Sequence, residues 1–77
     1  MNETDSIAKF IKQSRKAERI TQIQLSKLAG VGIRFVRELE SGKQTVQLRK
    51  VNQVLKLFGH VLAPVRIKKR LADKSNE

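Results

Sequence analysis

The stretch TQIQLSKLAGVGIRFVRELESG (residues 21–42) constrains the fold most, because it specifies two short helices joined by a tight turn. Thr21 can cap the first helix, and Gln24 stands where it would complete a capping box. Gly30 is expected to end this helix, since the residue after a helix often takes a positive φ angle that glycine adopts without strain. The second helix is then expected to begin at residue 32 or 33. Gly42 closes the pair.

Apolar residues within this stretch recur at helical spacing and define a face that should be buried. The residues predicted to face inward are Leu25, Leu28 and Ala29 in the first helix and Val31, Val36 and Leu39 in or beside the second. Ile20, just before the first helix, is placed to pack against Leu25. Two helices of about eight residues cannot form a stable core alone, so the flanking segments must complete it.

Two further helices are predicted, one over about Ser6 to Arg19 and one over about Gln47 to Phe58, while residues 1–5 are expected to be a flexible lead-in. The apolar positions of these helices are Ile7, Phe10, Ile11 and Ala17 in the first and Leu48, Val51, Leu55 and Phe58 in the second. Val54 and Leu57 form a second stripe on an adjacent face, which favours a second copy of the chain as its partner.

After Gly59 the apolar residues alternate, which predicts a short β-strand over residues 60–67. Pro64 restricts this strand to an edge, and no other segment reads as a strand. A lone strand leaves backbone groups unpaired, so we expect it to pair with its copy in a homodimer. An extended arm packed on its own domain is the alternative. The predicted dimerisation residues are Val54, Leu57, Val61, Leu62, Ala63, Val65 and Ile67. Residues 68–77 are expected to be a flexible charged tail.

The charge of the chain points to a polyanionic partner. Its 17 Lys and Arg against 7 Asp and Glu give a formal net charge of +10 over 77 residues. Nucleic acid is the first candidate, although a merely soluble basic surface or an anionic membrane stays open from charge alone. One domain is expected at this length. The chain has no cysteine and no signal-like apolar segment, which suits the cytoplasm.

No catalytic set is present in the sequence. The chain has one histidine, no cysteine, no tyrosine and no glycine-rich phosphate loop. Glu38 and Glu40 are two positions apart on a helix and therefore point to different sides. His60 lacks the partners that a metal site needs. We expect a protein that is not an enzyme and binds no metal or cofactor.

A helix-turn-helix of this form can lay its second helix in the major groove of double-stranded DNA. The residues predicted to read bases are Ile33, Arg34, Arg37 and Glu38. Arginine can bind guanine, glutamate can accept from cytosine, and isoleucine can pack on a thymine methyl group. Arg34 and Glu38 could instead form only a surface ion pair. Phe35 is interpreted as a residue at the edge of the core.

Phosphate contacts are predicted at both ends of this unit. Gln22 lies in the first turn of its helix, where free N–H groups favour an anion. The polar turn after the second helix supplies Ser41, Lys43, Gln44 and Thr45. An ordinary solvated loop is the alternative for this turn.

The segment ITQIQLSKLAGVGIRFVRELESGK resembles the Xre (Cro/C1-type) repressor family, and the similarity covers about residues 6–59. It implies an all-α, lambda-repressor-like bundle of four to five helices. By the resemblance, Gln22 binds phosphate, and Ile33, Arg34 and Glu38 fall on base-reading positions. Arg15 and Glu40 match a structural ion pair. Gly32 and Ile33 depart from the usual Ser or Thr cap and the frequent Gln.

The segment GIRFVRELESGKQTV, followed by a helix, a glycine and a terminal strand, is most similar to the HipB-like antitoxins. This resemblance implies a homodimer that represses its own operon, works at the bacterial nucleoid and binds a HipA-like serine/threonine kinase toxin. A stand-alone phage-type regulator without a toxin stays open, as does a toxin-neutralising module with only nonspecific DNA affinity. RNA is the weaker alternative, because the only aromatic residues are three phenylalanines.

Overall fold

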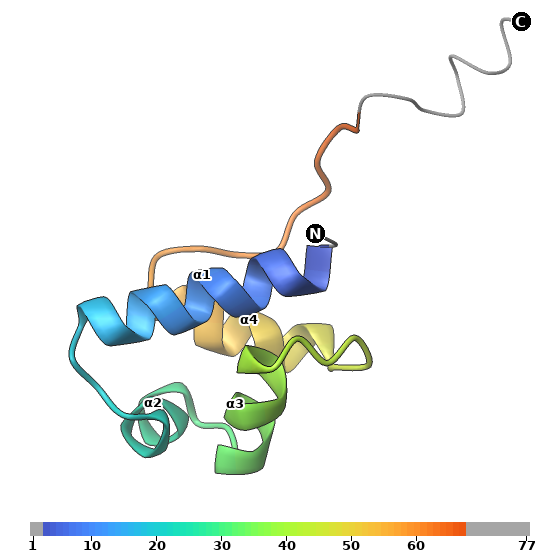
Figure 1. The fold of residues 1–77 in the computed structure, drawn as a ribbon. Helices are drawn as coiled ribbons and strands as arrows, with labels where there is room; N and C mark the ends of the chain where they lie inside the picture. The colour runs from blue at the N-terminus through green and yellow to red at the C-terminus, as the bar shows by residue number, and fades with distance from the viewer. Residues whose placement is uncertain (1–2, 68–77) are drawn as a thin grey trace, which may run out of the picture.

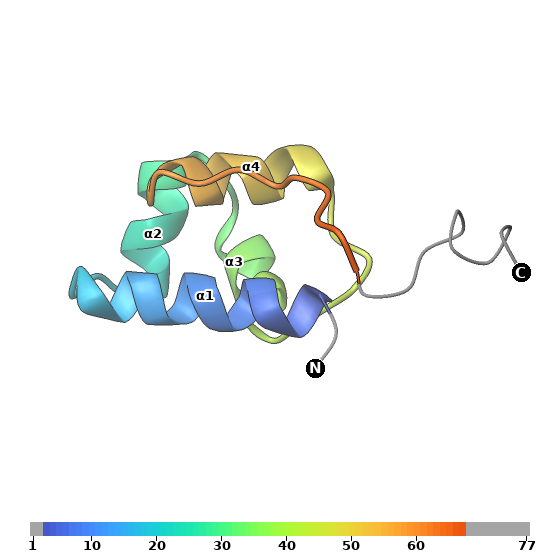
Figure 2. The ribbon, with the colours of Figure 1, turned by 90° about the horizontal axis from the view of Figure 1, so that it is seen from above.

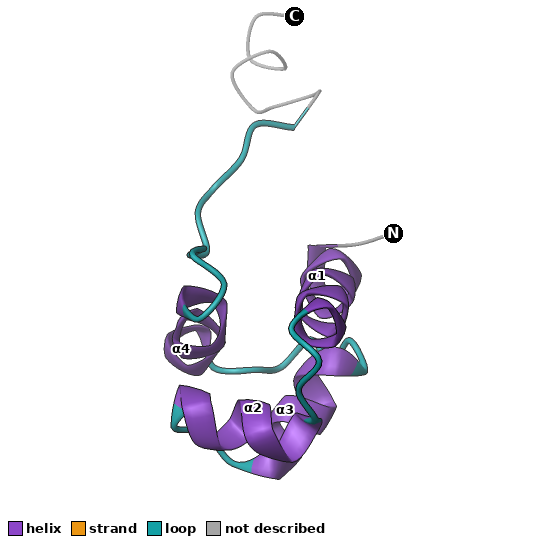
Figure 3. Cartoon of the chain, turned by 90° about the vertical axis from the view of Figure 1, so that its left-hand side faces the viewer, coloured by secondary structure: helices purple, strands orange, loops and turns teal. Residues whose placement is uncertain are grey.

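The computed structural model describes residues 3–67, which fold into a four-helix bundle (Figure 1). The helices are α1 (Glu3–Ala17), α2 (Gln22–Ala29), α3 (Ile33–Glu40) and α4 (Leu48–Lys56). Figure 3 shows α1 and α4 on one side of the bundle and α2 and α3 on the other. The prediction of an all-α helix-turn-helix bundle is confirmed for this range. The predicted tail, residues 68–77, lies outside the described residues.

Helix α1 is displaced from its predicted bounds at both ends. It begins at Glu3, earlier than the expected Ser6. Residues 3–5, which extend the helix, include no proline or glycine that would prevent this extension. It ends at Ala17 instead of Arg19, because Arg19 takes a left-handed φ of 57° and its N–H bonds to the Lys16 carbonyl at 3.0 Å.

Both caps of α2 form as predicted. Thr21 Oγ1 accepts a hydrogen bond from the Gln24 N–H at 3.0 Å, and Gln24 Oε1 accepts from the Thr21 N–H at 2.8 Å. Gly30 ends α2 with a φ of 74°, and the N–H groups of Gly30 and Val31 both bond to the Ser26 carbonyl. Helix α3 then begins at Ile33. These local bonds fix the turn between α2 and α3.

All four helices contribute to one apolar core. Its fully buried members are Ile11, Leu25, Val36, Leu39, Val51, Val54 and Leu55. Ile20 and Val31 pack against this cluster, as does Phe58, whose ring meets that of Phe10 edge to face at 6.5 Å. The described part of the chain has no helix long and apolar enough to cross a membrane.

Two leucines predicted to face the core are instead exposed. Leu28 is 62% exposed, because α2 buries the side that holds Leu25, Ser26 and Ala29, and each residue turns the helix by about 100°. Leu48 is 70% exposed, because it is the first residue of α4 and precedes the first buried turn at Val51. The predicted inward positions were wrong at these two sites and at Ala17, which is exposed at the end of α1.

Val54 was wrongly assigned to a second, dimerising stripe. Its side chain is fully buried beside Val51 and Leu55, so α4 has one wide core face and not two separate stripes. Leu57 is partly exposed beyond the end of the helix. The helix ends at Lys56, before the expected Phe58, and the chain turns through Gly59 at a φ of 73°.

The segment after Gly59 is extended but forms no strand within residues 3–67. Figure 2 shows it running back along α4. The Leu62 N–H donates to Asn52 Oδ1 at 2.7 Å, and the Leu62 side chain packs against the core. Val61 and Val65 are exposed, as are their neighbours from Ala63 to Ile67, so burial does not alternate along the segment. The described part of the chain offers this segment no strand partner.

Candidate nucleic-acid interface

The outer side of α3 carries the four residues predicted to read bases. Val36 and Leu39 bury the inner side of this helix, which turns Arg34 and Arg37 to solvent. Ile33 and Glu38 are half-buried beside them. The Arg34 side chain is 91% exposed in the first turn of α3. The structure therefore places these four residues on one accessible face.

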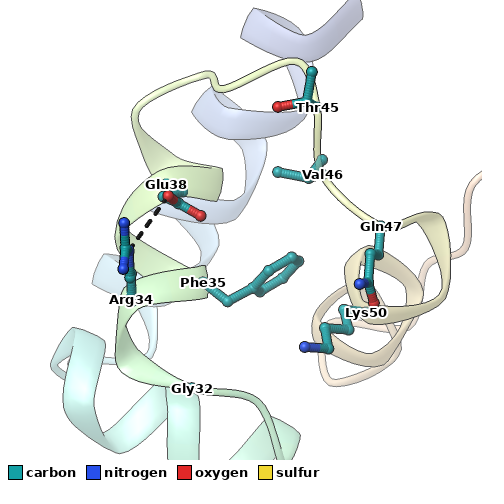
Figure 4. A pocket seen from close by; sticks show the side chains of 8 residues that line it. All are labelled: Gly32, Arg34, Phe35, Glu38, Thr45, Val46, Gln47 and Lys50. Carbon is teal, nitrogen blue, oxygen red and sulfur yellow. Dashed lines mark ion pairs between the residues drawn. The ribbon is translucent and has the colours of Figure 1, made fainter.

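Glu38 is held by two basic residues on this face. The Lys43 ammonium lies 2.9 Å from Glu38 Oε2, and Arg34 Nε lies 3.7 Å from the same oxygen (Figure 4). The hydrogen bond from Lys43 lowers the pKa of Glu38, and the positive charges of Lys43 and Arg34 add to this effect. Glu38 is therefore an ionised hydrogen-bond acceptor at neutral pH. The exposed pair with Arg34 is weak and leaves the guanidinium able to turn.

A hollow of about 350 Å³ lies between α3 and the start of α4. Its lining consists of Gly32, Arg34, Phe35, Glu38, Thr45, Val46, Gln47 and Lys50 (Figure 4). The Phe35 ring points into it, and the Lys50 ammonium lies 5.8 Å from the ring centroid. Phe35 also packs against the core, as a core-edge residue would.

Lys50 was not singled out by the sequence analysis, although it adds a cation beside the reading face. The sequence feature that could have indicated Lys50 is its place in the first turn of α4, directly after the polar turn. Of the predicted phosphate contacts in that turn, Thr45 lines the hollow and Lys43 bonds to Glu38. Ser41 donates to the Glu38 carbonyl at 2.7 Å, and Gln44 is exposed.

Gln22, at the start of α2, contacts a buried ion pair. Its Nε2 donates to Glu40 Oε1 at 3.2 Å. Arg15 approaches the same carboxylate with Nε at 2.7 Å from Oε2 and Nη2 at 3.0 Å from Oε1. Hydrogen bonding to the Glu40 side chain raises the pKa of Arg15 above its already high ordinary value. The ion pair implied by the family resemblance is thus present and joins α1 to the end of α3.

The predicted dimerisation residues after Gly59 belong to the C-terminal segment, whereas Val54 lies in the core beside residues of α3. Val61, Ala63, Val65 and Ile67 belong to the exposed C-terminal segment, and Leu62 is half-buried against α4. No group of three or more His, Cys, Asp or Glu that could hold a metal occurs among the described residues.

Two comparisons with known proteins identify the chain. The Helix-turn-helix family profile matches residues 11–61, a range that includes all of α2, α3 and α4. The chain is also 43% identical over 61 residues to the uncharacterized HTH-type transcriptional regulator y4mF of Sinorhizobium fredii (strain NBRC 101917 / NGR234). That alignment covers 75% of this chain and 80% of the relative. Because both matches span the capped helix pair together with the helix that closes its core, the chain belongs to the Cro/C1-type helix-turn-helix family of transcriptional regulators.

Proposed function

We propose that this regulator is a sequence-specific repressor that binds operator DNA as a homodimer. The observation that carries the proposal is the orientation of α3, which buries Val36 and Leu39 and leaves Arg34 and Arg37 accessible. The major groove is wide enough to admit a helix presented in this way. The net charge of +10 supports attraction to the duplex. The protein acts by binding and carries out no catalysis.

In this proposal the residues divide into base readers and phosphate contacts. Arg34 and Arg37 bind guanine through O6 and N7, Glu38 accepts from the cytosine amino group, and Ile33 packs on a thymine methyl. The predicted phosphate contacts are Gln22, Ser41, Lys43, Gln44 and Thr45. Lys43 is bonded to Glu38 in the free protein, so its transfer to a phosphate would release Glu38 for a base.

The division of roles predicts different effects for two alanine variants. Arg34→Ala should lower affinity at one base pair of the operator by about 1–3 kcal/mol and relax specificity there. Gln22→Ala should weaken binding to all sequences alike, because a phosphate contact carries no sequence information. The measurement is fluorescence anisotropy with the segment upstream of the gene, single-base variants of it and a scrambled duplex of equal length, over a range of salt.

Lys12→Ala, on the exposed side of α1, is the control for removal of one positive charge. If Arg34→Ala and Gln22→Ala reduce binding equally on every duplex, the assignment of α3 as the reading helix is wrong. Equal affinity of the unmodified protein for the upstream and scrambled duplexes would leave only nonspecific binding.

The homodimer is supported by the C-terminal segment. Val61, Val65 and Ile67 are exposed apolar side chains, and the backbone there has no ladder partner within the described chain. The bond between Leu62 and Asn52 holds the start of the extended segment against α4. Pairing with the same segment of a second copy would satisfy the backbone, and operator half-sites one helical turn apart would require the two reading helices to lie roughly 34 Å apart.

We further propose that the protein is the antitoxin of a HipBA-type module, autoregulates its operon in the bacterial cytoplasm and binds a serine/threonine kinase toxin. The support is the similarity of GIRFVRELESGKQTV and the C-terminal arrangement to HipB-like antitoxins. Co-expression with the product of a neighbouring kinase-like gene should give a complex that purifies intact and abolishes the growth arrest caused by that product alone. Growth arrest that persists with both proteins present would favour the second candidate, a stand-alone Xre-family regulator.

A further inference from the structure

The predicted phosphate contact of Gln22 is connected to the interior of the protein. The Glu40 side chain is only 2% exposed, and its Oε1 accepts from both Gln22 Nε2 and Arg15 Nη2. Arg15 also donates from Nη1 to the Ile20 carbonyl at 3.0 Å, just before α2. This network of Arg15, Glu40 and Gln22 links α1, the start of α2 and the end of α3.

A glutamine amide has two N–H donors, and the network uses one of them. The Nε2 atom of Gln22 bonds to Glu40, and among residues 6–67, whose side chains the structure describes, the second N–H has no acceptor. Because the two N–H bonds lie in the amide plane, fixing one direction also fixes the other. The residue is half-buried in the first turn of α2, so its side chain is partly open to solvent.

The charges of the network also suit an approaching phosphate. An isolated Glu40 carboxylate would repel a phosphate near Gln22, but the Arg15 guanidinium neutralises it through two hydrogen bonds. Glu40 therefore orients the amide without presenting net negative charge. The same carboxylate would force the Gln22 carbonyl oxygen away from itself, which prevents the amide from flipping.

We propose that Glu40 is a positioning residue for DNA binding, which holds the Gln22 carboxamide so that its second N–H is directed to a backbone phosphate. This inference rests on the proposed phosphate contact of Gln22 and goes beyond the structural role of the ion pair. A preorganised side chain loses less rotamer entropy on binding than a free glutamine.

The test is a double-mutant cycle on duplex affinity. Gln22→Ala should weaken binding roughly tenfold, as expected for loss of one hydrogen bond to a charged group. Glu40→Gln should weaken it roughly threefold to fivefold, because the one remaining acceptor oxygen is taken by Arg15. The variant with both changes should bind no more weakly than Gln22→Ala alone, since Glu40 acts through Gln22.

Val51→Ala is the matched control for lost stability, because it removes volume from the core outside this network. All affinities are measured at a temperature where circular dichroism shows every variant folded. If Val51→Ala and Glu40→Gln weaken binding equally, or if the double variant shows additive losses, Glu40 acts only through stability and the inference is wrong. If Gln22→Ala leaves affinity unchanged, Gln22 makes no phosphate contact. That result would overturn this part of the proposed function, and the positioning role of Glu40 with it.

Nuclear magnetic resonance of the unmodified protein gives an independent readout that does not depend on folding of a variant. Of the two Nε2 protons of Gln22, only the one that is not bonded to Glu40 should move strongly when duplex DNA is added. The proton bonded to Glu40 should stay nearly in place. Equal movement of both protons would overturn the positioning role.

Discussion

Arg15→Ala is expected to lower the free energy of unfolding by about 3 kcal/mol, because it leaves the Glu40 carboxylate buried without its cation. Only 12% of the Arg15 side chain and 2% of the Glu40 side chain are exposed, so the carboxylate depends on Arg15 more than on water for its partners. A domain of this size has a total stability of about 5 kcal/mol, so the loss is severe. Urea unfolding followed by circular dichroism measures it.

The matched control removes both charges together. Arg15→Met combined with Glu40→Leu should recover most of the lost stability, because apolar residues of similar volume can replace a buried ion pair at little cost. Arg34→Ala, which affects an exposed ion pair, should change stability by no more than about 0.5 kcal/mol. A similarly small effect of Arg15→Ala would mean that the pair contributes little to the fold.

Deleting residues 60–77 is expected to produce a monomer that binds its operator about 100-fold more weakly or worse, because two linked reading helices bind far more tightly than one. The helical core should survive, since its fully buried residues all lie in α1 to α4. Sedimentation equilibrium and operator titration measure the two effects on the same sample.

A chain that ends at Ile67 is the matched control, because it keeps the extended segment and loses only the charged tail. It should remain dimeric and show only a change in salt dependence. Val65→Lys, at an exposed position of the segment, should weaken self-association without affecting the core. An unchanged mass for the chain without residues 60–77 would remove the proposed dimerisation mode.

Local signals in the sequence were sufficient for the helix pair. The capping box of Thr21 and Gln24 and the glycine end at Gly30 formed as predicted, because each depends on bonds between residues a few positions apart. The inward positions Leu25, Val36 and Leu39 followed from helical spacing. The outward face of α3 followed from the same spacing, and its role in reading bases stays a prediction.

Packing between helices decided which apolar residues are buried, which the spacing of residues along one helix could not. Leu28 and Leu48 fit an apolar stripe but lie outside the faces that the bundle buries, and Val54 lies inside the core that one chain completes by itself.

By itself, the sequence determined where the central helices start and stop, because those signals act between near neighbours along the chain. Only the tertiary structure decided that Lys50 lies beside Phe35 and that Gln22 shares the Glu40 carboxylate with Arg15, because these residues come from different helices. Contacts of this kind depend on the angle and depth at which helices pack, which residue spacing within one helix does not encode.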